Sequence, residues 1–193
     1  MHPKQLLSAE SLLVLVMKNI VLIGFMGTGK TTVGRLLANR LGRPFFDSDK
    51  KIEHEQNMSI RELFKTYGEG YFRQKEKMMI YRLSRYRNAV IATGGGVVLS
   101  LDNMKHLKRN GIIIALTASA ETIFERINRR NTRPLLDHDP VKREQMVNAL
   151  LAERANLYLD ADYGIDTSNK SLQQVINEIL FFLRQGGYMR GKG

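Results

Sequence analysis

The stretch Gly24-Phe25-Met26-Gly27-Thr28-Gly29-Lys30-Thr31 decides the fold of this chain. It matches the pattern G-x-x-x-x-G-K-[ST], in which glycines let successive backbone N–H groups turn inward toward an anion. An apolar run at residues 19–23 precedes it, and residues 32–41 follow with apolar side chains at helical spacing. This order predicts a strand, a phosphate-binding turn and a helix whose positive N-terminal end faces the phosphates.

The same stretch predicts a site for a nucleoside triphosphate. Lys30 is expected to reach the β- and γ-phosphates, and the Thr31 hydroxyl is expected to ligate Mg²⁺. The alternative is a glycine turn that matches by chance, and the flanking strand and helix argue against it. We therefore assign nucleotide binding to a continuous run of residues, namely Gly27, Thr28, Gly29, Lys30, Thr31 and Thr32.

The composition describes one ordinary globular domain with a strong positive charge. A chain of 193 residues, 43% hydrophobic and 25% charged, is long enough for a sizeable core. The net charge of +11 favours either nucleic-acid binding or arginines that line a pocket for a small anion. The positions of the arginines, given below, favour the pocket.

Cysteine is absent from the sequence, which excludes a disulfide framework and thiolate metal sites. This suits a reducing compartment, and we expect a cytoplasmic protein. The apolar run at residues 12–16 is short for a signal peptide and has no small-residue cleavage site after it. We expect residues 1–16 to be an upstream extension, either mis-assigned coding sequence or a short helix packed outside the sheet.

Two acidic residues follow the second predicted strand. Asp47 and Asp49 come after Pro44-Phe45-Phe46, at the carboxyl end of the strand, where open α/β sheets bind ligands. Strand alternation would place both side chains on one side. Beside a triphosphate they suit support of Mg²⁺ and reception of a hydroxyl proton. The alternative is that Asp49 only caps a helix at residues 50–57.

A glycine triplet, Gly94-Gly95-Gly96, follows the third predicted strand at residues 88–93. Backbone flexibility is rarely needed at that point of a sheet, but close approach of a ligand to the backbone is, so we predict a ligand wall. A plain loop before the helix that begins at Ser100 or Leu101 is the alternative. Between the acidic pair and this strand, Ser59 and Glu62 form a capping box, Gly68 ends that helix, and a second helix at 69–85 follows.

The remaining chain predicts two more strands, at 111–116 and, weakly, at 162–166, and helices at 120–128, 141–159 and 172–184. Residues 128–138 are basic and contain proline without helical period, which suits a mobile lid over phosphates. Residues 17–184 thus form one domain, and the glycine-rich residues 185–193 are expected to fray.

Taken together, the motifs resemble shikimate kinases over residues 17 to 184. The resemblance rests on the ordered set GFMGTGKTT, FFDSD, GEGYFR, GGGVV, TRPLL and ERANLY. It implies a parallel-sheet α/β/α sandwich of the P-loop nucleoside-monophosphate-kinase type. It also implies transfer of the γ-phosphoryl group of ATP to the 3-hydroxyl of shikimate, in the route to chorismate and the aromatic amino acids.

The resemblance assigns a role to individual residues. Asp49 matches the carboxylate that holds the reacting hydroxyl and can act as base, and Asp47 matches the one near Mg²⁺. Arg73 and Arg154 match the pair that grips the shikimate carboxylate, and Gly94, Gly95 and Gly96 match the wall whose backbone meets shikimate. Arg133 matches the lid arginine that closes on the transferring phosphate. Thr31 matches the ligand of Mg²⁺. Arg126, Arg129 and Arg130 compete for the role of a further basic residue before the lid arginine, and the adenine-side loop is placed at about 166–170.

Three other functions were weighed. A related kinase such as gluconate kinase would share the phosphate loop, but the glycine triplet and the pair Arg73 and Arg154 argue against it. A GTP-driven switch would need the motifs Asn-Lys-x-Asp and Asp-x-x-Gly, which the sequence lacks. A nucleic-acid-binding module would need aromatics interleaved with basic residues on a sheet face. We expect shikimate as the partner, no nucleic acid, no membrane, and a monomer.

Overall fold

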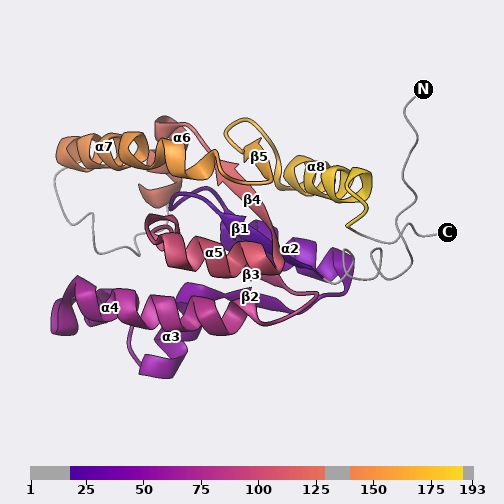
Figure 1. Cartoon of the computed structure of the whole chain (residues 1–193). Coiled ribbons are helices and arrows are strands. Elements are labelled where there is room, and N and C mark those ends of the chain that lie inside the picture. The colour runs from indigo at the N-terminus through magenta and orange to yellow at the C-terminus, as the bar shows by residue number, and fades with distance from the viewer. Residues whose placement is uncertain (1–17, 129–139, 189–193) are drawn as a thin grey trace.

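The computed structural model describes residues 18–128 and 140–188, with side chains from residue 144 onward in the second range. Within these residues a sheet of five parallel strands has the order β2-β3-β1-β4-β5. The strands are β1 (Asn19–Ile23), β2 (Phe45–Asp47), β3 (Val90–Ala92), β4 (Gly111–Thr117) and β5 (Tyr163–Asp166). The predicted parallel α/β/α sandwich is confirmed (Figure 1).

The central strand β1 shows why the sequence forms a sandwich. Its side chains alternate between two cores, as the period of a strand requires. Ile20 and Leu22 belong to one core, which α2 (Lys30–Leu41) and α8 (Leu172–Gln185) cover. Val21 and Ile23 belong to the other, and both faces are buried, which explains the uninterrupted apolar run.

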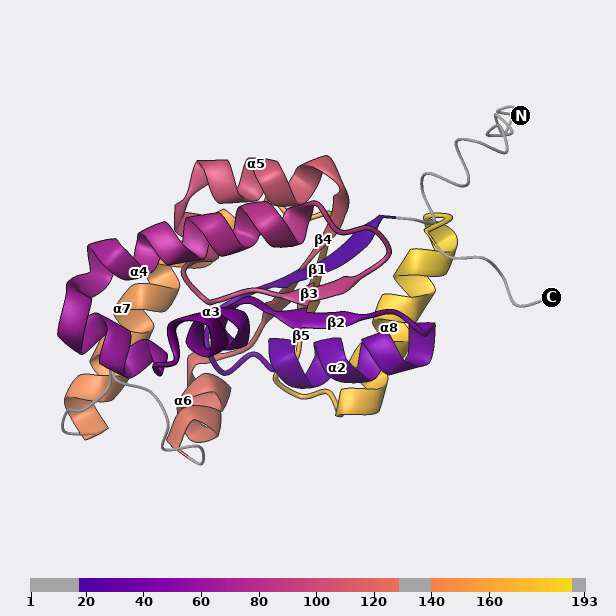
Figure 2. The same ribbon diagram turned by 90° about the horizontal axis from the view of Figure 1, so that it is seen from below.

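The second core is covered by the remaining long helices. These are α3 (Ser48–Gln56), α4 (Ile60–Ser84), α5 (Leu101–Arg109), α6 (Ala120–Asn128) and α7 (Pro140–Tyr158), with a short 3-10 turn η1 (Val97–Leu99) before α5. Figure 2 shows α4 and α5 on one side of the sheet and α2 on the other. None of the helices in the described ranges combines the length and the apolar composition that crossing a membrane requires.

Local signals set most helix boundaries. Ser59 and Glu62 form the predicted capping box, and Gly68 breaks the helical geometry of α4 with φ 78° and ψ 174°. The predicted end of one helix and start of the next at Gly68 is confirmed, because α4 consists of two helices that meet at this kink. Ser100 and Ser171 cap α5 and α8 through hydrogen bonds to the backbone N–H three residues on.

The chain beyond α8 stays packed further than expected. Gly186 follows the helix, and the Tyr188 ring lies 5.9 Å from that of Phe182. The N–H of Tyr188 also donates to the carbonyl of Leu183 at 2.8 Å. Residues 185–188, which were predicted to fray, are therefore packed, and residues 189–193 lie outside the described residues. The proposed extension at 1–16 and most of the proposed lid lie outside the described residues.

The contact between α2 and the sheet gives a stability prediction. A Cβ atom on Gly34 would lie 2.6 Å from Phe45 Cε2 and 3.2 Å from Leu22 Cδ1. Gly34→Ala should therefore lower the free energy of unfolding by about 2 kcal/mol through overpacking. Urea unfolding followed by circular dichroism measures this value.

The matched control is Gly70→Ala, also in a helix, where a Cβ atom would meet nothing within 4 Å. It should raise the free energy of unfolding by about 0.5 to 1 kcal/mol, because alanine loses less backbone entropy than glycine. Equal effects of the two substitutions would contradict the proposed close packing at Gly34.

Candidate functional site

The glycine loop between β1 and α2 has the shape that a phosphate requires. Gly24, Gly27 and Gly29 have φ values of 143°, 81° and 95°, which side-chain-bearing residues rarely adopt. At Gly24 a Cβ atom would also lie 2.1 Å from the Leu116 carbonyl oxygen. The loop therefore needs glycine for its backbone path, and it leads directly into the N-terminus of α2.

Lys30 and Thr28 hold this loop together. The ammonium of Lys30 donates to the carbonyl oxygens of Gly24 and Phe25, both at 2.7 Å, and the residue is only 8% exposed. The Thr28 hydroxyl donates to the same Phe25 carbonyl at 2.8 Å. The Lys30 side chain thus folds back over the loop.

A pocket of about 290 Å³ lies beside the loop on the side of α8. Arg126 lines it and donates from Nη1 to the Thr167 hydroxyl at 3.0 Å and from Nη2 to the Thr167 carbonyl at 2.8 Å. Other lining residues come from the phosphate loop, α2, the loop after β5 and α8, namely Gly27, Gly29, Thr32, Val33, Lys170 and Leu172. Of the three competing arginines, Arg126 therefore lies at the nucleotide side, whereas Arg129 and Arg130 lie outside the described residues.

Asp47 joins the loop to the second strand. Its Oδ2 accepts a hydrogen bond from the Thr31 hydroxyl at 2.7 Å, and its Oδ1 accepts one from the N–H of Lys50 at 3.1 Å. Asp47, and not Asp49, is thus the residue that caps the next helix. The strand-alternation argument for Asp49 was wrong, because the helix begins at Ser48 and places Asp49 in its first turn.

The pair of Thr31 and Asp47 suits a magnesium ion in its chemistry. Both side chains offer oxygen atoms, and Mg²⁺ bound with nucleotides takes one or two protein oxygens, with phosphates and water completing its shell. In the part of the chain that the structure describes, no cluster of three or more His, Cys, Asp or Glu forms a cage for a metal. The pair therefore fits an ion that arrives with a nucleotide.

The glycine triplet lies against the acidic residue and the first arginine. A Cβ atom on Gly94 would lie 2.4 Å from Asp49 Oδ1, and one on Gly96 would lie 2.4 Å from Arg73 Nη1. The Gly94 N–H also donates to the buried Ser48 hydroxyl at 2.9 Å, which ties the triplet to the start of α3. A side chain at Gly94 or Gly96 would displace Asp49 or Arg73 from these positions.

Glu76 is a member of this site that the sequence analysis missed. It is 2% exposed, its Oε2 accepts from Arg73 Nη1 at 3.0 Å, and its Oε1 has no partner among the described residues. Burial raises the pKa of Glu76, while the nearby charge of Arg73 acts in the opposite direction. The signal in the sequence was the spacing of three between Arg73 and Glu76 on one helix.

Arg154 approaches the same wall from α7. Its Nη1 donates to the Gly95 carbonyl at 3.4 Å, and its guanidinium carbon lies 5.6 Å from the centre of the Phe25 ring. A Cβ atom on Gly95 would lie 3.4 Å from the N of Met26. The acceptor side and the phosphate loop are therefore in direct contact, as phosphoryl transfer between them requires.

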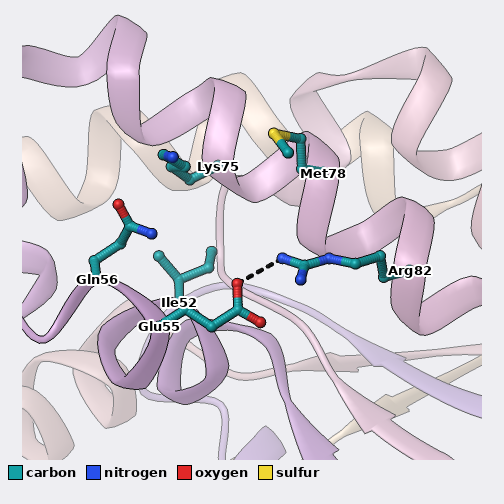
Figure 3. Close-up of a pocket in the computed structure, with 6 residues that line it drawn as sticks. All are labelled: Ile52, Glu55, Gln56, Lys75, Met78 and Arg82. Carbon is teal, nitrogen blue, oxygen red and sulfur yellow. Dashed lines mark hydrogen bonds and ion pairs between the residues drawn. The ribbon is translucent and has the colours of Figure 1, made fainter.

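A second pocket, of about 140 Å³, lies between α3 and α4. Figure 3 shows Glu55 of α3 joined to Arg82 of α4, with Ile52 between the two helices. The Arg82 Nη2 to Glu55 Oε2 distance is 2.6 Å. None of its lining residues was predicted as a site residue, and the ion pair links the helix of Asp49 to the helix of Arg73.

The structure thus brings together the predicted nucleotide, acceptor and metal residues. Arg133 is the exception, since it lies outside the described residues. The arrangement presents cations at a phosphate loop on one side and a carboxylate with two arginines on the other. An enzyme that moves a phosphoryl group to a small anionic acceptor needs cations beside the phosphates, and a carboxylate and arginines beside the acceptor.

Comparisons with known proteins agree with this arrangement. Residues 26–184 match the family model described as shikimate kinase. The chain belongs to the shikimate kinase family. A shikimate kinase from Caldanaerobacter subterraneus subsp. tengcongensis is 49% identical over 165 residues, which cover 85% of this chain and 95% of that protein.

Solved structures give the same assignment. The shikimate kinase from Acinetobacter baumannii in complex with shikimate has a TM-score of 0.84 and 36% sequence identity, and covers 90% of this chain and 97% of its own. A gluconokinase from Sinorhizobium meliloti has a TM-score of 0.56 and 17% identity, over 89% of this chain and 94% of its own. That likeness extends to the fold alone, so the predicted alternative is only distant.

The environment of Glu76 gives a prediction on pH dependence. The pKa of Glu76 is higher in the folded chain than in the unfolded chain. As the pH rises through the unfolded pKa, the folded chain therefore binds more protons than the unfolded chain, and its stability decreases. Glu76→Gln removes this titration. The free energy of unfolding of the variant, relative to the parent, should therefore increase from pH 4 to pH 7.

Urea unfolding at several pH values tests this, with Glu55→Gln as the control, since Glu55 forms an exposed ion pair with Arg82. A relative stability of Glu76→Gln that falls as the pH rises would contradict the raised pKa.

Proposed function

We propose that this chain transfers the γ-phosphoryl group of ATP to the 3-hydroxyl of shikimate, giving shikimate 3-phosphate and ADP. The observation that carries the proposal is the junction of the phosphate loop and the acceptor wall, where Arg154 donates to the Gly95 carbonyl and its guanidinium carbon lies 5.6 Å from the centre of the Phe25 ring. Membership of the shikimate kinase family supports the identity of the acceptor, as does the likeness to a structure solved with shikimate.

The phosphate loop would hold the donor. Its inward N–H groups and the N-terminus of α2 favour negative charge, and Lys30 is close enough to move from the loop carbonyls to the β- and γ-phosphates. Thr31 and Asp47 would hold Mg²⁺, which supplies charge neutralisation to the phosphates. Arg126 and Lys170 line the pocket that would hold the adenine base of ATP.

Asp49 would accept the proton of the reacting hydroxyl. As the new oxygen–phosphorus bond forms, the bond between the γ-phosphorus and the bridging oxygen breaks, and ADP leaves with that electron pair. The close approach of Gly94 to the carboxylate fixes the place of Asp49. Positioning of this kind supplies most of the rate in phosphoryl transfer, since the protein has little covalent chemistry to do.

Arg73 and Arg154 would hold the carboxylate of shikimate. They reach the acceptor wall from different helices, α4 and α7, and a planar guanidinium matches a carboxylate with two parallel hydrogen bonds. Glu76 and Glu69 hold Arg73 with hydrogen bonds of 3.0 Å and 2.9 Å. Arg133 would close on the transferring phosphate and help to exclude water.

We further propose that the enzyme acts as a monomer in the cytoplasm. The residues assigned to the donor, the metal and the acceptor all occur in this one sequence, so the proposed reaction does not require a second copy. The sequence has no cysteine, which fits a reducing compartment.

The decisive experiment is coupled measurement of ADP release with ATP and Mg²⁺, comparing shikimate, gluconate and no acceptor. Release should depend on shikimate. Release with gluconate, or with neither acceptor, would overturn the assignment of Asp49, Arg73 and Arg154 while leaving the phosphate loop intact. Mass spectrometry of the product identifies the phosphorylated acceptor.

The role of Asp49 gives a separate prediction. Asp49→Asn keeps the size of the side chain but removes the proton acceptor, so kcat should fall by about 10²- to 10⁴-fold. ATP binding, measured by calorimetry, should stay within about twofold because the phosphate loop is unchanged. Lys51→Gln is a control on the same helix, and its kcat should stay near that of the parent. Normal turnover of Asp49→Asn would refute the proposed role.

A further inference from the structure

Arg154 and Tyr158 carry two buried polar groups that hydrogen bonding leaves incomplete. Nε of Arg154 and the hydroxyl of Tyr158 are both buried and have no hydrogen-bond partner among the described residues. Arg154 is 9% exposed and Tyr158 is 7% exposed, so the bulk solvent does not supply partners. Buried polar groups without partners are uncommon in proteins because each one destabilises the folded state.

The two groups are complementary in their hydrogen-bonding capacity. They lie four residues apart on α7, a spacing that places side chains on one face of a helix. Helical side chains lean toward the N-terminus, so that of Tyr158 leans toward Arg154. The positive charge of Arg154 acts on the Tyr158 hydroxyl, and Nε can only donate whereas a phenol oxygen can accept.

The titration of Tyr158 argues against a role in proton transfer. Burial raises its pKa to about 12, with the charge of Arg154 acting in the opposite direction. The hydroxyl therefore stays protonated at neutral pH, where a tyrosine base would have to lose its proton. What remains for it is to accept or donate a hydrogen bond.

We propose that Tyr158 is a positioning residue for Arg154. When the guanidinium of Arg154 turns from the Gly95 carbonyl toward the carboxylate of the acceptor, the Tyr158 hydroxyl oxygen accepts a hydrogen bond from the Nε–H of Arg154. This rests on the proposed function, in which Arg154 grips that carboxylate. With Nε bonded to Tyr158, the terminal Nη1 and Nη2 groups form the fork that faces the acceptor. The 3.4 Å bond from Nη1 to Gly95 is long, so little is lost when the guanidinium turns.

Tyr158→Phe tests the proposal, because it removes only the hydroxyl. The KM for shikimate should rise about tenfold, the usual effect of losing one hydrogen bond to a charged group. The KM for ATP should stay within about twofold, and the melting temperature should stay the same or rise, because an unpartnered buried hydroxyl has been removed. Tyr163→Phe, in β5 and remote from the acceptor side, should change neither KM.

The ratio of the shikimate KM values of variant and parent should also be constant from pH 6.5 to pH 9. An unchanged shikimate KM in Tyr158→Phe would overturn the proposal. So would a fall in melting temperature with equal rises in both KM values, which indicates a packing role, or a ratio that changes with pH. If the parent enzyme shows no activity with shikimate but phosphorylates another acceptor, the proposed function itself fails, and the carboxylate role of Arg154 fails with it.

Discussion

The site depends on one constraint, which is that three neighbouring parallel strands end at the same level of the sheet. In the register of the sheet, Leu22 of β1 pairs with Ala92 of β3, and Ala92 pairs with Asp47 of β2. Because the strands are parallel, their carboxyl ends meet at one edge. The phosphate loop, the acidic residues and the glycine triplet each follow one of these ends, so the sheet assembles the site from segments far apart in the sequence.

Acidic and basic side chains lie together at this edge of the sheet. Glu76 accepts a hydrogen bond from Arg73, Asp47 and Asp49 lie at the start of α3, and Arg154 adds a cation from α7. A triphosphate and a carboxylate would otherwise repel one another inside so small a volume. Part of the strong positive charge of the chain lies in the arginines of this site.

Sequence alone was sufficient for the parts of the site that local rules determine. The glycine positions of the phosphate loop and the capping box at Ser59 follow from backbone conformation and local hydrogen bonds. The strand-alternation argument for Asp49 failed because the helix begins at Ser48, with Asp47 as its cap, two residues earlier than predicted. Glu76 was missed because its burial arises from packing between α4 and the glycine triplet, which a single helix pattern does not show.

The two sides of the site differ in how far their hydrogen bonding is complete. On the nucleotide side, Thr28, Lys30 and Arg126 all donate to backbone carbonyls or to Thr167, so these donors are already bonded within the protein before any ligand is considered. On the acceptor side, Glu76 and Arg154 keep buried atoms with bonding capacity left. Each such atom costs about 1 to 3 kcal/mol of stability. A triphosphate can be recognised by the backbone N–H groups of a preformed loop. A small polyol with one carboxylate needs side chains whose hydrogen-bonding capacity is not already used within the protein.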